Sequence, residues 1–257
     1  MIWQDISGGW VLLPQEQKGI VHFLGGAFVA TAPNITYRCV LEELGKQGYV
    51  VIATPFVNTL DHSAIARNVL NRFESILYRL QETNSLSNRY LPVYGVGHSL
   101  GCKLHLLIGS LYKVERSGNI LISYNNYPAS RAIPFLESFS GNPSLNLNVE
   151  FTPSPEETND LIAGSYAIRR NLLIQFSNDT IDQCSILSPV LESRFPNMVT
   201  VQKLPGNHLT PLSQDINWQV GKEFTPLDAI GQWVKQTFSR ELVGLNSEIS
   251  RWLNPVW

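Results

Sequence analysis

A serine placed between two glycines constrains this chain more than any other feature of its sequence. The pentapeptide Gly-His-Ser-Leu-Gly at Gly97–Gly101 follows an apolar run, Leu91–Val96, and precedes a run with helical character, Cys102–Tyr112. Glycines two residues before and after a serine permit a tight bend between a strand and a helix, where side chains would crowd the backbone. The pattern therefore predicts that Ser99 is held on a strand-to-helix turn, as a serine nucleophile is.

The size and composition of the chain favour one domain that handles small or neutral ligands. A chain of 257 residues is long enough for one large core, and α/β folds of this length are often single domains. Charged residues make up 16% of the chain and its net charge is -2, which gives no electrostatic footprint for nucleic acid or an anionic membrane. We expect a single domain over residues 1–257 with a small-molecule partner. Nothing in the sequence indicates an oligomeric state.

Several sequence signals are absent. The N-terminus has no basic region followed by an apolar stretch, and no segment approaches the roughly 18 apolar residues of a membrane helix. The three cysteines, Cys39, Cys102 and Cys184, are scattered, and no residues have the spacing of metal ligands. No phosphate-binding loop or dinucleotide fingerprint is present. We therefore expect a cytoplasmic protein without an integral membrane segment, whose chemistry needs no metal and no cofactor.

Apolar runs alternate with helix-patterned segments, which is typical of a parallel sheet wrapped by helices. The predicted strands are residues 19–24, 49–53, 91–96, 119–123, 172–176 and 198–204, and the predicted helices are 35–47, 61–83, 102–112 and 227–238. Five prolines interrupt short amphipathic pieces between residues 124 and 170, where no strand is apparent. We interpret 124–170 as an inserted cap.

A nucleophilic serine requires a base, and the base requires a carboxylate to orient it. In the chain order serine, acid, histidine, the base comes last, and His208 lies on a loop just past a late strand, from which it can reach the carboxyl ends of the strands. The acid is expected on the loop after residues 172–176, where Asp179 and Asp182 both stand. We favour Asp179 because it is nearer the strand end, and keep Asp182 as the alternative acid.

Acyl transfer also needs two backbone N–H donors aimed at the developing oxyanion. Leu100, directly after the serine, is expected to supply one of them. The second is expected from the loop after the first buried strand, where Gly25 and Gly26 allow close approach of the backbone. Gly26 and Ala27 are both candidates for this donor.

The other four histidines are interpreted mainly as structural residues. His22 and His105 lie inside a predicted strand and a predicted helix, and His98 adjoins the serine on a turn that points its side chain away from it. His62 stands near a helix start, where a surface or cap-proximal role is favoured over lining a pocket.

These motifs together resemble the α/β-hydrolase fold superfamily over about residues 19–240. Segments 22–28, 150–158 and 171–183 more closely resemble the domain-of-unknown-function family 1350, which is found mainly in cyanobacteria and plastids. The superfamily resemblance implies an eight-stranded, mostly parallel sheet flanked by helices, with a cap inserted after the sixth strand. The closer family implies no substrate.

The superfamily resemblance also implies hydrolysis of an ester, thioester or amide through an acyl-enzyme, with Ser99, Asp179 and His208 as the triad. Leu24 departs from this pattern, because many relatives carry a histidine there that braces the oxyanion loop. Two function classes follow: a serine hydrolase acting on a small or lipid-like ester or thioester, and a non-catalytic relative that binds a ligand or protein partner in the same pocket. A lyase or perhydrolase on the same fold is a third reading.

Overall fold

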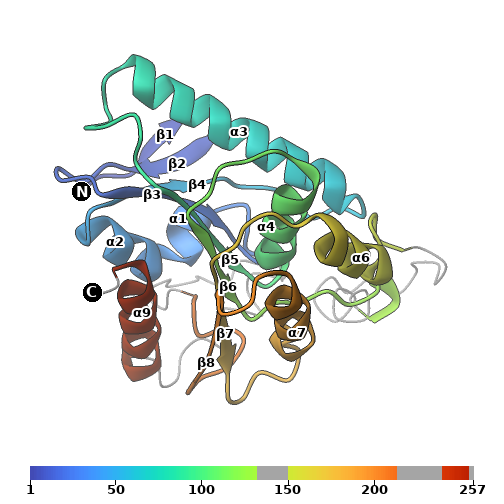
Figure 1. Cartoon of the computed structure of the whole chain (residues 1–257). Coiled ribbons are helices and arrows are strands. Elements are labelled where there is room, and N and C mark those ends of the chain that lie inside the picture. Colours follow the sequence, from blue (N-terminus) through green and yellow to red (C-terminus); the bar gives the residue numbers. More distant parts are fainter. Residues whose placement is uncertain (132–149, 213–238, 255–257) are drawn as a thin grey trace, which may run out of the picture.

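Eight strands form one sheet in the computed structural model, which describes residues 1–131, 150–212 and 239–254 (Figure 1). The strands are β1 (Gln4–Ile6), β2 (Gly9–Leu12), β3 (Gly19–Leu24), β4 (Tyr49–Ala53), β5 (Val93–His98), β6 (Gly118–Ile122), β7 (Asn171–Phe176) and β8 (Val199–Leu204). Their order across the sheet is β1-β2-β4-β3-β5-β6-β7-β8. The β1–β2 and β2–β4 pairs are antiparallel and all other pairs are parallel. The prediction of an eight-stranded, mostly parallel sheet is confirmed.

Helices cover both faces of this sheet. The described helices are α1 (Pro33–Thr36), α2 (Arg38–Lys46), α3 (His62–Glu82), α4 (Leu100–Leu111), α6 (Pro155–Ser165), α7 (Cys184–Arg194) and α9 (Ser239–Leu253). Helices α2 and α9 pack on one face, and α3, α4, α6 and α7 pack on the other (Figure 1). The molecule therefore has three layers, helix on sheet on helix, as the alternating sequence pattern predicts.

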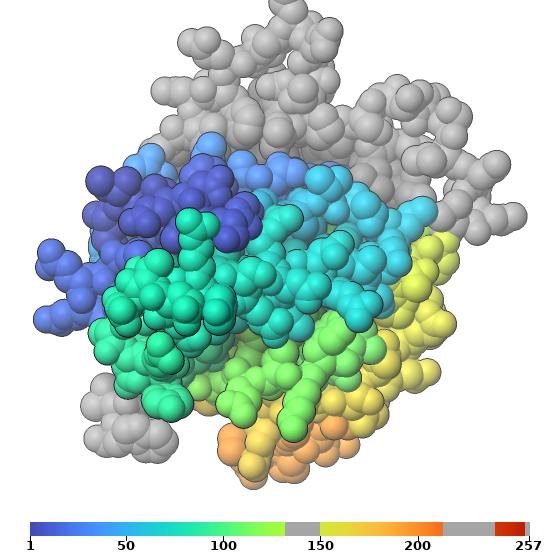
Figure 2. Space-filling model, turned by 90° about the horizontal axis from the view of Figure 1, so that it is seen from above, coloured from blue at the N-terminus to red at the C-terminus, as the bar shows by residue number. Residues whose placement is uncertain are grey.

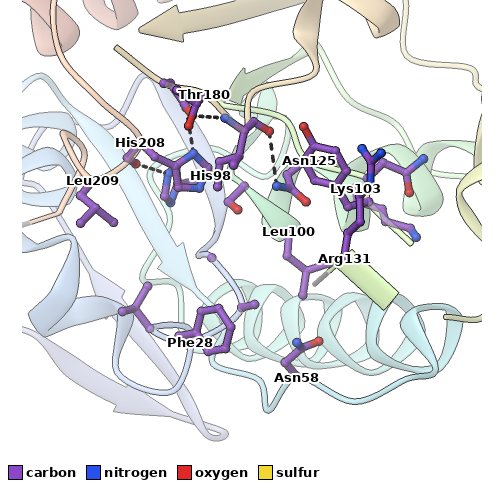
Figure 3. A pocket seen from close by; sticks show the side chains of 18 of the residues that line it. Phe28, Asn58, His98, Leu100, Lys103, Asn125, Arg131, Thr180, His208 and Leu209 are labelled. Carbon is purple, nitrogen blue, oxygen red and sulfur yellow. Dashed lines mark hydrogen bonds and ion pairs between the residues drawn. The ribbon is translucent and has the colours of Figure 1, made fainter. Parts of the chain in front are cut away.

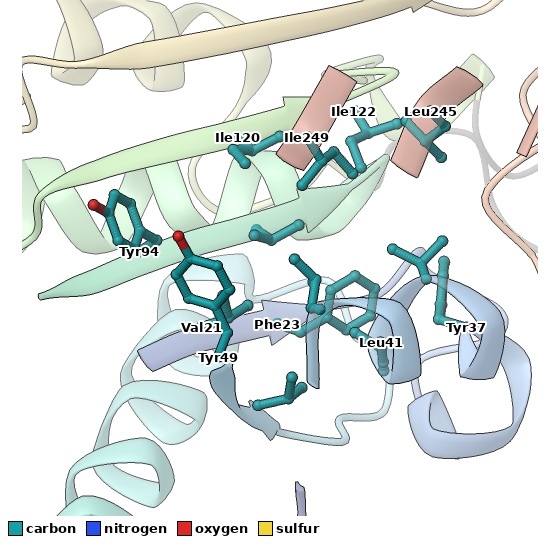
Figure 4. Close-up of a cluster of buried hydrophobic side chains, with 14 of the residues drawn as sticks. Val21, Phe23, Tyr37, Leu41, Tyr49, Tyr94, Ile120, Ile122, Leu245 and Ile249 are labelled. Carbon is teal, nitrogen blue, oxygen red and sulfur yellow. The ribbon is translucent and has the colours of Figure 1, made fainter. Parts of the chain in front are cut away.

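The central strands are apolar on both faces because both faces are covered. Alternate side chains of β3 point to opposite layers. Val21 and Phe23 join the cluster that includes Leu41 of α2 and Ile249 of α9 (Figure 4), whereas Ile20 packs in the cluster beneath α3. This two-sided burial is why the strand predictions at 19–24 and 49–53 match β3 and β4 residue for residue.

The N-terminal hairpin β1–β2 adds two strands at one edge of the sheet, and neither strand is among the predicted ones. Its residues, dark blue in Figure 2, lie against the cyan-to-teal helix α3. A Cβ at Gly9 would lie 2.5 Å from the Cδ1 atom of Ile76 in α3, so the hairpin packs closely on this helix and a larger residue at position 9 would shift the Ile76 side chain. The strands have only three and four residues and β1 is largely exposed, so their sequence signal is weak.

The expected cap segment contains helix α6, which packs beside α4 and α7. Its N-terminus is a capping box, in which the Ser154 hydroxyl accepts from the Glu157 N–H and the Glu157 carboxylate accepts from the Ser154 N–H. Helices α7 and α9 have no counterpart among the predicted helices, and the helix predicted at 227–238 lies outside the described residues.

The parallel strands bring their carboxyl ends to one edge of the sheet, where ligand sites of α/β proteins form. The loops after β3, β5, β7 and β8 leave from this edge, and each of them carries at least one of the predicted site residues. In the parts of the chain that the structure describes, no helix is both long enough and apolar enough to cross a membrane.

Candidate active site

Ser99 is the single residue between β5 and α4. Its backbone has φ 54° and ψ -118°, a left-handed conformation that is uncommon for a residue with a side chain. The two flanking glycines are sterically required. A Cβ at Gly97 would lie 2.7 Å from the backbone of Gly101, and a Cβ at Gly101 would lie 2.1 Å from the carbonyl oxygen of Leu24. The turn is thus built as the sequence predicts, with strain concentrated at the serine.

His208 and Asp179 are in direct contact at the same edge of the sheet. The Nδ1 atom of His208 lies 2.8 Å from the Oδ2 atom of Asp179, and the Asp179 side chain is fully buried. The other carboxylate oxygen of Asp179 accepts from the N–H of Ile181 at 3.0 Å. Burial opposes ionisation of Asp179, but these hydrogen bonds outweigh burial and hold the pKa of its carboxyl below the ordinary value. The carboxylate is therefore ionised and orients the imidazole.

Asp182, the alternative acid, is used elsewhere. Its Oδ1 atom accepts from the side-chain amide of Gln175 at 2.8 Å and from the N–H of Cys184, at the start of α7, at 3.0 Å. Burial raises the pKa of its carboxyl. The structure thus pairs Asp179 with His208 and gives Asp182 to the beginning of a helix.

The two candidates for the second oxyanion donor differ in what their N–H groups contact. The N–H of Gly26 donates to the hydroxyl of Tyr37 at 2.7 Å and is therefore occupied. Ala27 lines the same cavity as Ser99, and no residue that the structure describes accepts its N–H. Leu100 is the first residue of α4, where a backbone N–H has no partner within the helix. The geometry favours Ala27 over Gly26 as the donor that accompanies Leu100.

A buried series of hydrogen bonds links the loop after β3, which carries Gly26, to the loop after β8, which carries His208. It runs from Gly26 N–H to the hydroxyl of Tyr37, from Tyr37 to the Nδ1 atom of His98 at 2.8 Å, and from the Nε2 atom of His98 to the carbonyl oxygen of His208 at 2.9 Å. A carbonyl only accepts, so Nε2 of His98 carries the proton and Nδ1 accepts from Tyr37. Burial, with His208 nearby, lowers the pKa of His98 to about 3, which keeps the ring in this neutral form.

These hydrogen bonds hold the loop after β3 without a side-chain donor at Leu24. His98 is a buried hydrogen-bonding residue, as the sequence predicts, and it links the loop after β3 to the loop after β8. Tyr37 has no sequence signal for this role, because it is an aromatic residue inside a predicted helix. Burial raises its hydroxyl pKa, so it remains a neutral donor and acceptor.

A cavity of about 980 Å³ opens beside these groups. Ser99, Asp179 and His208 all line it, and Figure 3 shows His208 and Leu209 on one side with Lys103, Asn125 and Arg131 on the other. Its apolar wall is formed by Phe28, Val29, Leu100, Phe151, Leu209 and Leu212. His62 is only 3% exposed and lines the same cavity, so the expectation of a surface position for it is wrong.

Lys103 is a cavity residue that the sequence reasoning missed. It lies in α4, four residues after the serine, and is only 1% exposed. A signal was present in the sequence, because Lys103 is the one charged residue in a helix that is otherwise almost entirely apolar. In the described ranges, no group of three or more histidine, cysteine, aspartate or glutamate side chains is arranged to hold a metal ion.

The family model described as "Protein of unknown function (DUF1350)" matches residues 2–255. The chain belongs to the DUF1350 family. No curated protein sequence matches it.

Solved structures show which fold this DUF1350 protein shares. A soluble variant of monoglyceride lipase from Saccharomyces cerevisiae, in complex with a substrate analog, superposes with a TM-score of 0.61 at 14% identity, over 98% of this chain and 94% of the lipase. An esterase from Pyrococcus furiosus gives a TM-score of 0.58 at 15% identity, over 95% of this chain and 85% of the esterase. S-formylglutathione hydrolase (FrmB) from Staphylococcus aureus gives 0.57 at 14% identity, over 96% and 92%. The DUF1350 chain therefore has the α/β-hydrolase fold.

Proposed function

We propose that this protein is a serine hydrolase that cleaves an ester or thioester through an acyl-enzyme. The observation that carries the proposal is the 2.8 Å contact between His208 Nδ1 and the buried carboxylate of Asp179, in the cavity that Ser99 also lines. A histidine held in this way by an ionised carboxylate presents its other ring nitrogen as a base. The fold shared with a lipase and two esterase-type enzymes supports the same reading.

The proposed reaction assigns one task to each group. With its Nδ1–H donated to Asp179, His208 takes the proton of the Ser99 hydroxyl on Nε2 while the serine oxygen bonds to the substrate carbonyl carbon. The N–H groups of Leu100 and Ala27 stabilise the oxyanion. His208 then passes the proton to the leaving oxygen or sulfur. A water molecule, deprotonated by His208, then attacks the acyl-enzyme carbonyl. The bond to the Ser99 oxygen breaks, His208 returns the proton to that oxygen, and the acid is released.

The cavity suits a substrate with an apolar chain. Its volume lies in the upper part of the range for small-molecule sites, and its apolar wall can cover an acyl group. Asn125, Tyr127 and Phe151 line the cavity from the segment 124–170, which supports the proposal that this segment caps the site.

Covalent labelling tests the proposal. Wild-type protein is treated with a fluorophosphonate probe and examined by intact mass and peptide mapping, next to Ser99→Ala and Ser75→Ala. Ser75 is an exposed serine on α3 and serves as the matched control. We expect labelling at Ser99 in wild type and Ser75→Ala, and none in Ser99→Ala. A folded wild-type protein that remains unlabelled would instead favour the non-catalytic, ligand-binding class.

A further inference from the structure

The cavity beside Ser99 contains a buried ammonium group with an incomplete set of partners. The Nζ atom of Lys103 donates to the carbonyl oxygen of Pro153 at 3.1 Å and lies 5.7 Å from the centroid of the Phe151 ring. An ammonium carries three donors, and within the described residues no carboxylate lies within 4 Å of this one. The group also stands in the first turn of α4, where the helix dipole disfavours a cation. Lys103 is therefore costly to bury unless a ligand completes its hydrogen bonds.

His62 is a second buried polar group in the same cavity without a partner. Its ring stacks on Phe151 with centroids 4.3 Å apart, so His62 and Lys103 both contact the same aromatic ring. Neither ring nitrogen of His62 has a hydrogen-bond partner among the described residues, although both are buried. Burial, together with Lys103, lowers the pKa of His62 to about 3, so the neutral ring offers one N–H donor.

Arg131 adds a second positive charge to the cavity wall. Its guanidinium lies over the ring of Tyr127 at 5.9 Å, and no acidic side chain of the described ranges forms an ion pair with it. Figure 3 shows Arg131 and Lys103 on the same side of the pocket. Of the acidic residues that the structure describes, Asp179 alone lines the cavity, and it is held by His208. The wall opposite His208 is thus positive and rich in donors.

We propose that Lys103, His62 and Arg131 form a subsite for an anionic group, and that the substrate is an ester or thioester bearing a carboxylate or phosphate. The substrate class rests on the proposed hydrolase function. Lys103 follows Ser99 by four residues, an axial rise of about 6 Å along α4. Both side chains also line the same cavity, so one small ester can contact both of them.

Two matched pairs of esters test the subsite and identify the source of the anion. The first pair is 4-nitrophenyl hexanoate and mono-4-nitrophenyl adipate, which differ by a terminal carboxylate on the acyl chain. The second is 1-hexanoylglycerol and 1-hexanoylglycerol 3-phosphate, which differ by a phosphate on the leaving group. The proteins are wild type, Lys103→Met and Lys113→Met, the last an exposed lysine just beyond α4.

We expect wild type and Lys113→Met to prefer the anionic member of one pair by about 10-fold or more in kcat/KM. Lys103→Met should lose this preference, and the change should appear in the KM ratio of the two members of the pair rather than in the kcat ratio. Equal turnover of both members of each pair by wild type, or an unchanged preference in Lys103→Met, would overturn the subsite.

Direct binding separates the subsite from the hydrolase function. Adipate and glycerol 3-phosphate are titrated into Ser99→Ala, with and without Lys103→Met, by calorimetry. Lys103-dependent binding in a protein whose Ser99 does not react with fluorophosphonate would keep the subsite and remove the hydrolase proposal. Labelling of Ser99 without binding of either anion would keep the hydrolase proposal and remove the subsite.

Kinetics of the wild-type protein as a function of pH test the subsite without any variant. Burial lowers the pKa of Lys103 to about 8, while the carboxylates of Glu150 and Glu157 oppose this shift. Above this pH the ammonium loses its charge, whereas His62 stays neutral. The preference of wild type for the anionic ester should therefore fall between pH 7 and 9 relative to the neutral ester. A preference that is constant over this range would contradict the role of Lys103.

Discussion

Replacing Tyr37 by phenylalanine isolates the hydrogen-bond chain that braces the oxyanion loop. The change removes one hydroxyl and leaves two buried groups without partners, the N–H of Gly26 and the Nδ1 atom of His98. An unsatisfied buried polar group costs about 1–3 kcal/mol, so the free energy of unfolding should fall by roughly 2–4 kcal/mol after relaxation of the loop. For a domain of this size that loss lowers Tm by roughly 5–15 °C.

The same substitution should lower activity beyond its effect on stability. Without its contact to Tyr37 the oxyanion loop is free to shift, and loss of one oxyanion donor costs about 10²–10³ in rate. We expect kcat to fall by about 10- to 100-fold, because the N–H of Ala27 is displaced rather than removed. Thermal melting and steady-state hydrolysis of a 4-nitrophenyl ester, measured well below Tm, give the two numbers.

Tyr166→Phe is the matched control for this experiment. The Tyr166 hydroxyl is also fully buried and also makes two hydrogen bonds, with Asn119 and Asn171 at 2.7 Å each, but it does not belong to the linkage between the loops. It should lose similar stability and keep kcat within about 3-fold. Wild-type kcat in Tyr37→Phe, or an equal loss of kcat in Tyr166→Phe, would refute the bracing role.

Three further predictions follow from the contacts around the serine. Asp179→Asn should reduce kcat/KM by about 10⁴-fold, as expected when the orienting carboxylate is lost, whereas Asp182→Asn should cost less than about 10-fold; steady-state kinetics that reverse this order would reassign the acid. Because the pKa of Asp179 is lower in the folded state than in the unfolded state, its ionised form stabilises the fold above the unfolded-state pKa, and this stabilisation is lost as the pH falls through the folded-state pKa. The difference in free energy of unfolding between wild type and Asp179→Asn, measured with urea, should therefore narrow from pH 7 to pH 3. A constant difference would contradict the assignment. Gly101→Ala should fail to give soluble, folded protein, because its Cβ would lie 2.1 Å from the Leu24 carbonyl oxygen. A variant with unchanged circular dichroism and Tm would show that the strand-to-helix turn relaxes more easily than its geometry implies.

Strong local signals made most of the sheet predictable. Strands buried on both faces, such as β3 and β4, are continuous apolar runs in the sequence. The strand-to-helix turn at Ser99 needs glycines at fixed offsets from the serine. The hairpin β1–β2 gives a weaker signal, because both strands are short and β1 is largely exposed. The loops that carry Asp179 and His208 were also predictable, because each follows a parallel strand and those strands end at one edge.

Contacts made only in three dimensions escaped prediction. Tyr37 reaches His98 across 61 positions of sequence, and no local pattern relates the two residues. Nor does the sequence separate Gly26 from Ala27, since the difference arises from the Tyr37 hydroxyl that occupies one N–H. Lys103 is intermediate: its charge inside an apolar helix was visible, but its partners Pro153 and Phe151 come from a distant segment.

The route from Gly26 through Tyr37 and His98 to His208 also changes how relatives of this chain should be recognised. A search that requires a histidine ahead of the oxyanion-loop glycines would discard this sequence at Leu24 and class it as a degenerate copy of an enzyme. A search that accepts a tyrosine at the junction of the two following helices, together with a histidine just before the serine, would retain it. Tyr37 and His98, which are distant in sequence, can thus together hold the loop that a single histidine holds in other sequences. A missing motif residue is therefore a poor reason to exclude activity.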